Sequence, residues 1–253
     1  MSLVKKIIIG VAVYLLFLIV LFPASVAVSL APLPNNIKVS GVSGTLWSGN
    51  AELIAIGPRQ LERVHWQLSP WGLFLGKANL DLVIGNRANV VNGKGSVSLS
   101  LSSINVEQLR FDAPSEFILG SARLPFRTNV EGHFSLIVQQ FDQGQPWCEQ
   151  LNGKLFAQQL QVNNQFGQYP LGNIEVGLSC EDGNIKVATN ENMNALGLDG
   201  NALLKADKLF QVSAKIKETD AQPKDLKQAL GFLGKKDSQG YYPITYQGQV
   251  PGL

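Results

Sequence analysis

The sequence is poor in the residues that build catalytic and metal centres. Its 253 residues include two histidines, two cysteines and two methionines, and charged side chains make up 16%. The cysteines form no CxxC pair, and neither a GxSxG motif nor a glycine-rich phosphate loop occurs. His65 and His133 each lie in an alternating pattern, so we interpret both as strand residues. The sequence predicts no enzyme, no cofactor and no metal site.

The chain after Lys6 also has no net positive charge. Lys5 and Lys6 precede a long apolar run, and the other 19 lysines and arginines balance the 19 aspartates and glutamates. A neutral domain lacks the electrostatic footprint of a nucleic-acid-binding protein. The low charge, together with 25 glycines, favours β structure over a helical bundle.

Charge is missing altogether from residues 7–31, a run whose centre reads IIIGVAVYLLFLIVLF. As a helix this run would measure roughly 37 Å, enough to cross a hydrocarbon core of about 30 Å. Because two lysines precede it, the positive-inside rule predicts residues 1–6 in the cytoplasm, an anchor over 7–31 and an exported domain over 32–253.

A cleaved signal peptide is the alternative interpretation of the same run. Ser25-Val26-Ala27 offers small residues for cleavage after Ala27, and Pro23 would break a helix in either case. The run continues apolar beyond this point, which favours an anchor that is kept. Both interpretations export the same domain.

Past the apolar run, polar and apolar side chains alternate, as they do in half-buried antiparallel strands. Glycine recurs between polar residues within these patterns, at irregular intervals that indicate bulges or bends rather than a fixed repeat. Residues 223–234 instead have helical spacing, with Pro223 at the start and Gly234 at the end. We predict an all-β fold: a transmembrane helix, then strongly curved antiparallel sheet(s) resembling a half-barrel, with one short helix near the C-terminus. A polar segment at 139–146 indicates a subdivision of the β domain.

Two features mark candidate sites within the β domain. Cys148 and Cys180 would form a disulfide in an oxidising compartment, closing a loop of about 31 residues that stabilises by roughly 3–4 kcal/mol; two buried free thiols are the alternative. Four large rings also lie close together in the sequence, and they either form a corner of the core, which we favour, or line an apolar groove for a lipid or peptide. These rings are Trp47, Trp66, Trp71 and Phe74.

Two stretches carry a resemblance to a known family. Residues 42–49 read VSGTLWSG and are followed by VHW at 64–66 and SPWGL at 69–73; near the C-terminus, DLKQAL precedes KDSQGYY and ITYQG. Both stretches resemble the type II secretion system protein N family. The motif residues are Gly44, Thr45, Leu46, Trp47, Gly49, Trp66, Pro70, Trp71, Gly240, Tyr241, Tyr246 and Gly248.

The resemblance implies an inner-membrane protein of a Gram-negative bacterium, with one span and a periplasmic domain, that serves the export of folded proteins across the outer membrane. It implies no catalytic residues. We expect a non-enzymatic accessory module that contacts other secretion subunits, either inner-membrane assembly proteins or the outer-membrane secretin, by strand addition at a sheet edge. The alternative is a periplasmic carrier that holds lipid or a lipidated protein on an apolar concave face.

Overall fold

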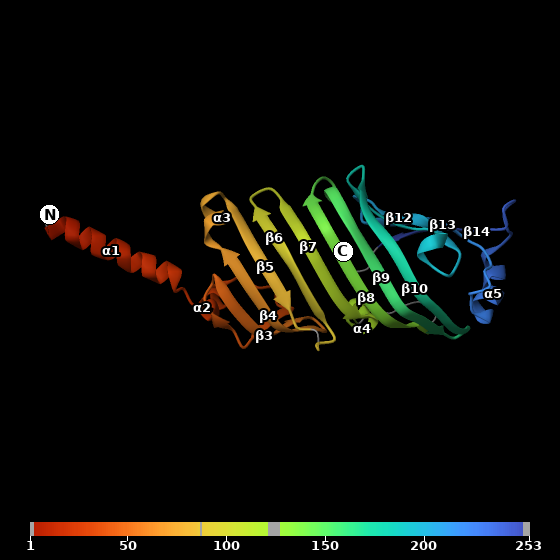
Figure 1. The fold of residues 1–253 in the computed structure, drawn as a ribbon, viewed down its shortest axis with the longest axis horizontal. Coiled ribbons are helices and arrows are strands. Elements are labelled where there is room, and N and C mark those ends of the chain that lie inside the picture. Colours follow the sequence, from red (N-terminus) through yellow and green to blue (C-terminus); the bar gives the residue numbers. More distant parts are fainter. Residues whose placement is uncertain (1–2, 87, 121–126, 250–253) are drawn as a thin grey trace.

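The computed structural model describes residues 3–86, 88–120 and 127–249. These residues form two N-terminal helices followed by one antiparallel sheet of 14 strands, which is open rather than closed (Figure 1). The predicted all-β fold, with an apolar N-terminal helix and a short helix near the C-terminus, is therefore confirmed, and the structure adds short helices that the sequence did not predict. A single sheet runs through segment 139–146, where the composition indicated a subdivision.

The apolar N-terminal run folds as two helices, α1 (Leu3–Val20) and α2 (Ala24–Leu30). Pro23 separates them with an extended backbone, because its ring cannot continue a helix. The 18 residues of α1 measure about 27 Å, close to the thickness of a hydrocarbon core. Among the described residues, α1 is the one helix long and apolar enough to cross a membrane. The run is thus not one continuous helix over 7–31.

The strands follow one another across the sheet in chain order, except that the two-residue β2 pairs with β3. Consecutive strands are therefore neighbours, as in a meander, and the connection between β13 and β14 is a long one that contains helices. The strands are β1 (Ile37–Ser40), β2 (Ser43–Gly44), β3 (Ser48–Ile56), β4 (Arg59–Ser69), β5 (Lys77–Ile84), β6 (Asn92–Ser100), β7 (Ile104–Pro114), β8 (Asn129–Gln143), β9 (Cys148–Asn164), β10 (Gly167–Glu181), β11 (Asn184–Thr189), β12 (Leu198–Leu204), β13 (Leu209–Ile216) and β14 (Tyr242–Gln249).

Short helices interrupt some of the connections. They are α3 (Pro70–Phe74), α4 (Ser115–Leu119), η2 (Glu191–Met193), α5 (Lys224–Leu230) and η3 (Gly231–Leu233). The helix predicted near the C-terminus is α5 continued by η3. It packs against the end of β13 and the start of β14, where Leu230 lies in a buried cluster with Ile216 and Tyr242.

One face of the sheet is apolar across most of its width. The register places apolar residues of neighbouring strands opposite one another, as with Trp66 and Leu82 or Leu136 and Leu155. Such pairs are the unit of sheet stabilisation. Further pairs are Leu80 with Val97, Ala157 with Ile174, Leu178 with Val187, and Ala202 with Val212.

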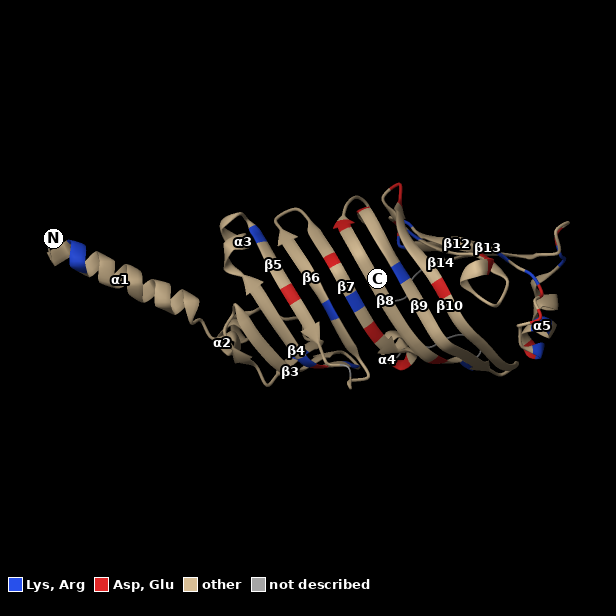
Figure 2. Cartoon of the chain, viewed as in Figure 1, with Lys and Arg blue, Asp and Glu red and all other residues tan. Residues whose placement is uncertain are grey.

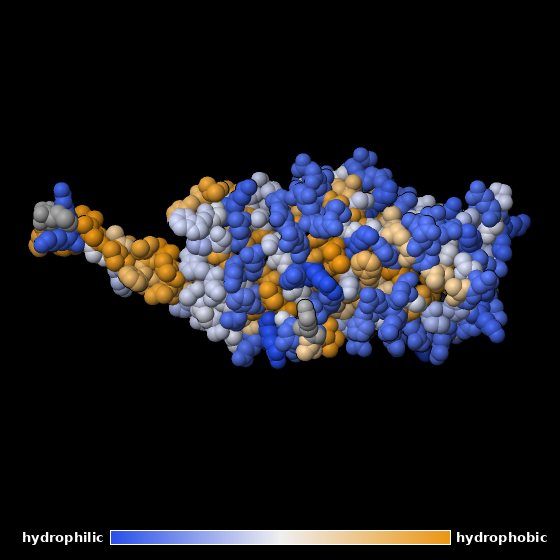
Figure 3. Space-filling view, in the orientation of Figure 1, coloured by the Kyte–Doolittle hydropathy of each residue, from blue (hydrophilic) through white to orange (hydrophobic). Residues whose placement is uncertain are grey.

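The other face is polar and its side chains bond to one another across the strands. Ser96 donates to the carboxylate of Asp81 at 2.5 Å, and the ammonium of Lys154 lies 2.7 Å from the carboxylate of Glu175. Figure 2 shows charged residues spread over β5 to β10, and Figure 3 shows the largely hydrophilic surface of that region. The alternation read from the sequence therefore corresponds to one polar and one apolar face.

Two of the recurrent glycines sit where the backbone leaves no room for a side chain. Gly132 has φ +145° at a register shift between β8 and β9, as a bulge requires. A Cβ at Gly200 would lie 2.4 Å from the Cα of Ala214. The glycines thus permit a bulge in one place and a close strand approach in another.

Candidate interaction surfaces

The first motif forms a tight turn between β2 and β3. Gly44 has φ +86°, and a Cβ there would lie 2.6 Å from the carbonyl oxygen of Ser48, so the turn requires glycine. The Thr45 hydroxyl accepts a hydrogen bond from the Ser48 amide at 3.2 Å. This turn presents Leu46 and Trp47 to the end of the N-terminal helix.

The same turn joins α1 to the sheet. The indole Nε1 of Trp47 donates to the carbonyl oxygen of Ile19 at 2.8 Å, and the Leu46 amide donates to the carbonyl of Phe22 at 2.8 Å. Next along the chain, Pro23 forms an isolated β-bridge with Thr45. A side-chain hydrogen bond and a backbone bridge therefore hold the exit of α1 against the sheet.

Trp66 is held by the other half of this motif. Its indole Nε1 donates to the carbonyl of Leu46 at 3.1 Å. Its ring lies against Gly49, where a Cβ would be 2.3 Å from Cζ2 of the ring. The motif therefore fixes Trp47 toward the helix and Trp66 toward the apolar face.

The apolar face is hollowed between β3 and β6. A cavity of about 310 Å³ opens there, and all nine residues that line it are apolar. We call this cavity the apolar trough. Its lining consists of Leu46, Ile54, Val64, Trp66, Leu68, Ala78, Leu80, Leu82 and Leu99. At the other end of the sheet, α5 packs against β13 and β14, as described above.

The structure separates the four rings that the sequence groups together. Trp66 lines the apolar trough, whereas Trp47 lies at the junction with α1. Trp71 and Phe74 lie on α3, with ring centroids 6.1 Å apart, and both rings are largely exposed. Pro70 occupies the first position of α3, where its missing N–H costs nothing.

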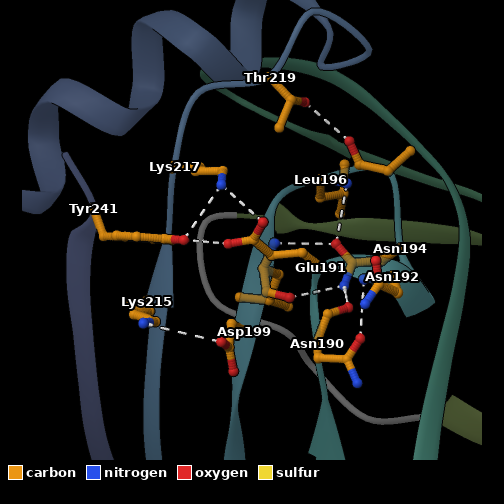
Figure 4. Close-up of polar contacts among 12 residues, drawn as sticks. Asn190, Glu191, Asn192, Asn194, Leu196, Asp199, Lys215, Lys217, Thr219 and Tyr241 are labelled. Carbon is orange, nitrogen blue, oxygen red and sulfur yellow. Dashed lines mark hydrogen bonds and ion pairs between the residues drawn. The ribbon is translucent and has the colours of Figure 1, made fainter. Parts of the chain in front are cut away.

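The second motif secures the C-terminal strand to η2 (Figure 4). The hydroxyl of Tyr241 donates to the carboxylate of Glu191, which also lies 2.7 Å from the ammonium of Lys217. The ammonium of Lys215 lies 4.4 Å from the Tyr241 ring centroid, a cation–π contact. Hydrogen bonds from Lys217 and Tyr241 lower the pKa of Glu191, and the bond to Glu191 raises the pKa of Lys217.

The remaining motif residues support this C-terminal region. Gly240 has φ +85° in the turn before Tyr241, and a Cβ at Gly248 would lie 2.5 Å from the hydroxyl of Tyr246. A second ion pair joins Lys236 to Glu218 at 3.0 Å, and it lowers the pKa of Glu218. The sequence alternation gave no sign of these pairs, because the partners are far apart in the chain.

Cys148 and Cys180 are joined by a disulfide, with their Cα atoms 6.1 Å apart. Cys148 is the first residue of β9, and Cys180 is the second-last residue of β10, just before the hairpin to β11. The bond therefore ties neighbouring strands near the middle of the sheet. The hairpin that follows has Asp182 and Gly183 at positive φ, as a two-residue turn requires.

The histidines lie on separate strands of the sheet. His65 on β4 bonds to the amide side chain of Asn50 at 2.8 Å, and His133 lies opposite Gln158 on β8 and β9. Among the described residues, no group of three or more His, Cys, Asp or Glu side chains is placed to hold a metal ion.

The sheet also ends in a free strand edge. β14 pairs with β13 along its whole length, and no strand in the described part of the chain pairs with its other side. Such an edge presents unpaired backbone N–H and C=O groups to any extended segment. This edge and the apolar trough are two surfaces that can bind another molecule.

These features define a class: an open β-meander with one apolar face, joined at its first strands to an apolar helix. The family model for type II secretion system (T2SS), protein N, matches residues 35–245. The chain is 33% identical to type II secretion system protein N of Aeromonas hydrophila, over 94% of each chain, and 28% identical to that of Vibrio cholerae, over 92% of each. The chain therefore belongs to the type II secretion system protein N family. No solved structure matches it.

Proposed function

We propose that this protein is an inner-membrane-anchored periplasmic module that binds other type II secretion subunits during assembly or export. Its family makes it an accessory component of type II secretion. In this proposal α1 spans the inner membrane with Lys5 and Lys6 on the cytoplasmic side, and the sheet lies in the periplasm. The disulfide is consistent with that oxidising compartment.

The observation that carries the proposal is the free edge of β14. Strand addition to such an edge gives affinity through main-chain hydrogen bonds, and side-chain pockets give specificity. Tyr246 and Gly248, both motif residues, lie on this strand, and the Tyr241 contact with Glu191 holds its start in place. The edge is thus fixed in position for an incoming strand.

Photocrosslinking in cells tests the proposal. A photoreactive residue is scanned through β14, with the interior strand β9 as the matched control, and adducts are identified by mass spectrometry. We expect adducts to secretion subunits at positions in β14 and none at inward-facing positions of β9. Adducts to no secretion subunit, or unchanged secretion and complex assembly after deletion of the protein, would contradict the proposal.

The apolar trough supports a second candidate, a carrier of lipid or a lipidated protein. Its lining is wholly apolar and open on one side, as an acyl chain requires. Lipid extraction of protein purified gently from membranes tests it: a stoichiometric lipid is expected, and Leu80→Asp within the trough should abolish its recovery. Recovery of no lipid from the wild-type chain would count against the carrier.

A further inference from the structure

Two adjacent connections at one end of the sheet carry exposed apolar side chains. On α3 and its C-cap, Trp71, Phe74 and Leu75 are 77%, 84% and 81% exposed. Leu101, in the turn from β6 to β7, is fully exposed. The first residue of β5 pairs with the last residue of β6, so the two connections are neighbours. We call these four side chains the apolar rim.

The apolar rim contains no charge, unlike the connection farther along the same end of the sheet. No acidic or basic residue occurs in 69–76 or in 99–103, whereas the β10–β11 turn carries Glu181 and Asp182. Figure 2 shows acidic residues at the tips of β8 and β10 and none at α3. Contiguous exposed apolar surface of this kind marks a site of interaction with a protein or a membrane.

The helix that carries most of the rim packs closely against the sheet. Gly72 of α3 is packed so closely that a Cβ there would lie 2.5 Å from the carbonyl oxygen of Lys77. The short helix is thus pressed onto the start of β5, while the side chains of Trp71 and Phe74 are exposed. Trp71 and Phe74 contact each other there instead of joining the apolar trough.

The position of the rim relative to α1 identifies what covers it. In Figure 1, α3 lies at the same end of the sheet as α1 and α2, and Figure 3 shows hydrophobic surface at this corner and along α1. The contacts of Trp47 with Ile19 and of Leu46 with Phe22 fix the helix exit to the start of β3. The amide of Leu68, two residues before α3, donates to the carbonyl of Trp47 at 2.7 Å. A bilayer that surrounds α1 therefore ends beside α3.

We propose that the apolar rim inserts into the interfacial region of the bilayer that α1 spans, as a second membrane contact of the domain. The inference rests on the proposed anchoring by α1. Tryptophan is enriched at membrane interfaces because its ring is apolar and its N–H is polar, and phenylalanine and leucine insert beside it in interfacial helices. Two contacts, one spanning and one interfacial, fix the tilt of the sheet and place the open trough next to the bilayer.

Site-specific lipid crosslinking tests this inference. The full-length chain is reconstituted in nanodiscs of phosphatidylethanolamine and phosphatidylglycerol, with p-azidophenylalanine in place of one phenylalanine at a time. Phe74 probes the rim and Phe17 probes α1. Phe232 on η3, which is 93% exposed at the far end of the sheet, is the matched control. All three rings are exposed, so the replacements leave the packing of the sheet intact.

We expect lipid adducts at positions 17 and 74 and none at position 232. Adducts at 17 but not at 74 would overturn the rim contact and leave the anchor intact, assigning the rim to a protein partner. Absence of adducts at 17 would overturn the anchor and the rim contact together. Equal adducts at 74 and 232 would show nonspecific labelling of exposed rings and would also overturn the rim contact.

Discussion

The indole N–H of Trp47 donates a hydrogen bond to the backbone carbonyl of Ile19, with the nitrogen 2.8 Å from the oxygen. Ile19 lies in the last turn of α1, where carbonyl groups lack α-helical partners. One side chain of the GTLWSG motif thus closes the helix and joins it to the sheet. This contact sets how the sheet is held at the C-terminal end of α1.

Replacing Trp47 with phenylalanine should loosen this junction. Phenylalanine keeps an aromatic ring but has no N–H to donate, so we expect a loss of about 0.5–1.5 kcal/mol in the free energy of unfolding from the hydrogen bond alone. Thermal unfolding of the full chain in detergent micelles measures it. Trp71→Phe is the matched control and should change stability by less than about 0.5 kcal/mol, because Trp71 is exposed. Equal losses in both variants would contradict the assigned role.

Gly49→Ala should destabilise the sheet near the trough. The added methyl group would overlap the Trp66 ring and lie 2.9 Å from the carbonyl of Thr45, so we expect a cost of about 1–3 kcal/mol. Denaturant unfolding followed by tryptophan fluorescence measures it. Gly231→Ala is the control, since that glycine has helical backbone angles and open space around its Cβ position. A neutral result at position 49 would show that the ring can move away.

Removal of the disulfide should lower stability more than either change at the junction. In the chain-entropy model, Cys148→Ala with Cys180→Ala costs roughly 3–4 kcal/mol, since the bond joins residues 32 apart. Guanidinium unfolding of the wild type and of the double variant measures the difference in their free energies of unfolding. A reducing agent should shift the wild-type midpoint toward that of the double variant and leave the variant unchanged. Identical midpoints would mean that the bond contributes no net stability.

Acid should weaken the C-terminal strand. The pKa of Glu191 and that of Glu218 are lowered by Lys217 and Lys236, below the ordinary value of 4.5. Their ion pairs therefore stabilise the fold above that pH, and the stabilisation is lost as the pH falls from about 4.5 through the lowered pKa values. Hydrogen exchange of β14 between pH 7 and pH 3 measures the loss.

The matched control for this acid effect is the double variant Glu191→Gln with Glu218→Gln. It should exchange faster than the wild type at pH 7 and show a smaller further change below pH 4.5, once the intrinsic pH dependence of exchange is corrected. The same pH dependence in both proteins would assign the acid effect to other carboxylates.

Local patterns in the sequence predicted the elements of the fold well. Alternation gave the strands and their apolar face, and the spacing from Pro223 gave α5. These features depend on residues close together in the chain. The alternation left open whether the strands form one sheet or more, because the polar segment at 139–146 resembles a linker and yet lies partly within β8.

These local patterns could not predict contacts between residues that are far apart in the chain. Tyr241 and Glu191 are 50 residues apart, and nothing in either segment indicates that they meet. The aromatic cluster was misleading for a similar reason, since ring density does not report exposure. The uncharged segment 69–76 was a usable signal for the rim, because four large apolar residues without alternation fit neither a strand face nor a buried helix.

The central claim is that β14 receives a strand from another secretion subunit, and hydrogen exchange of its amides tests this most directly. The peptide covering 242–249 is compared in the purified full-length chain and in the assembled secretion complex, with the interior strand β9 as the reference. The account predicts rapid exchange of the edge amides in the isolated chain and clear protection in the complex, with β9 unchanged. Equal exchange of β14 in both states would contradict strand addition at this edge.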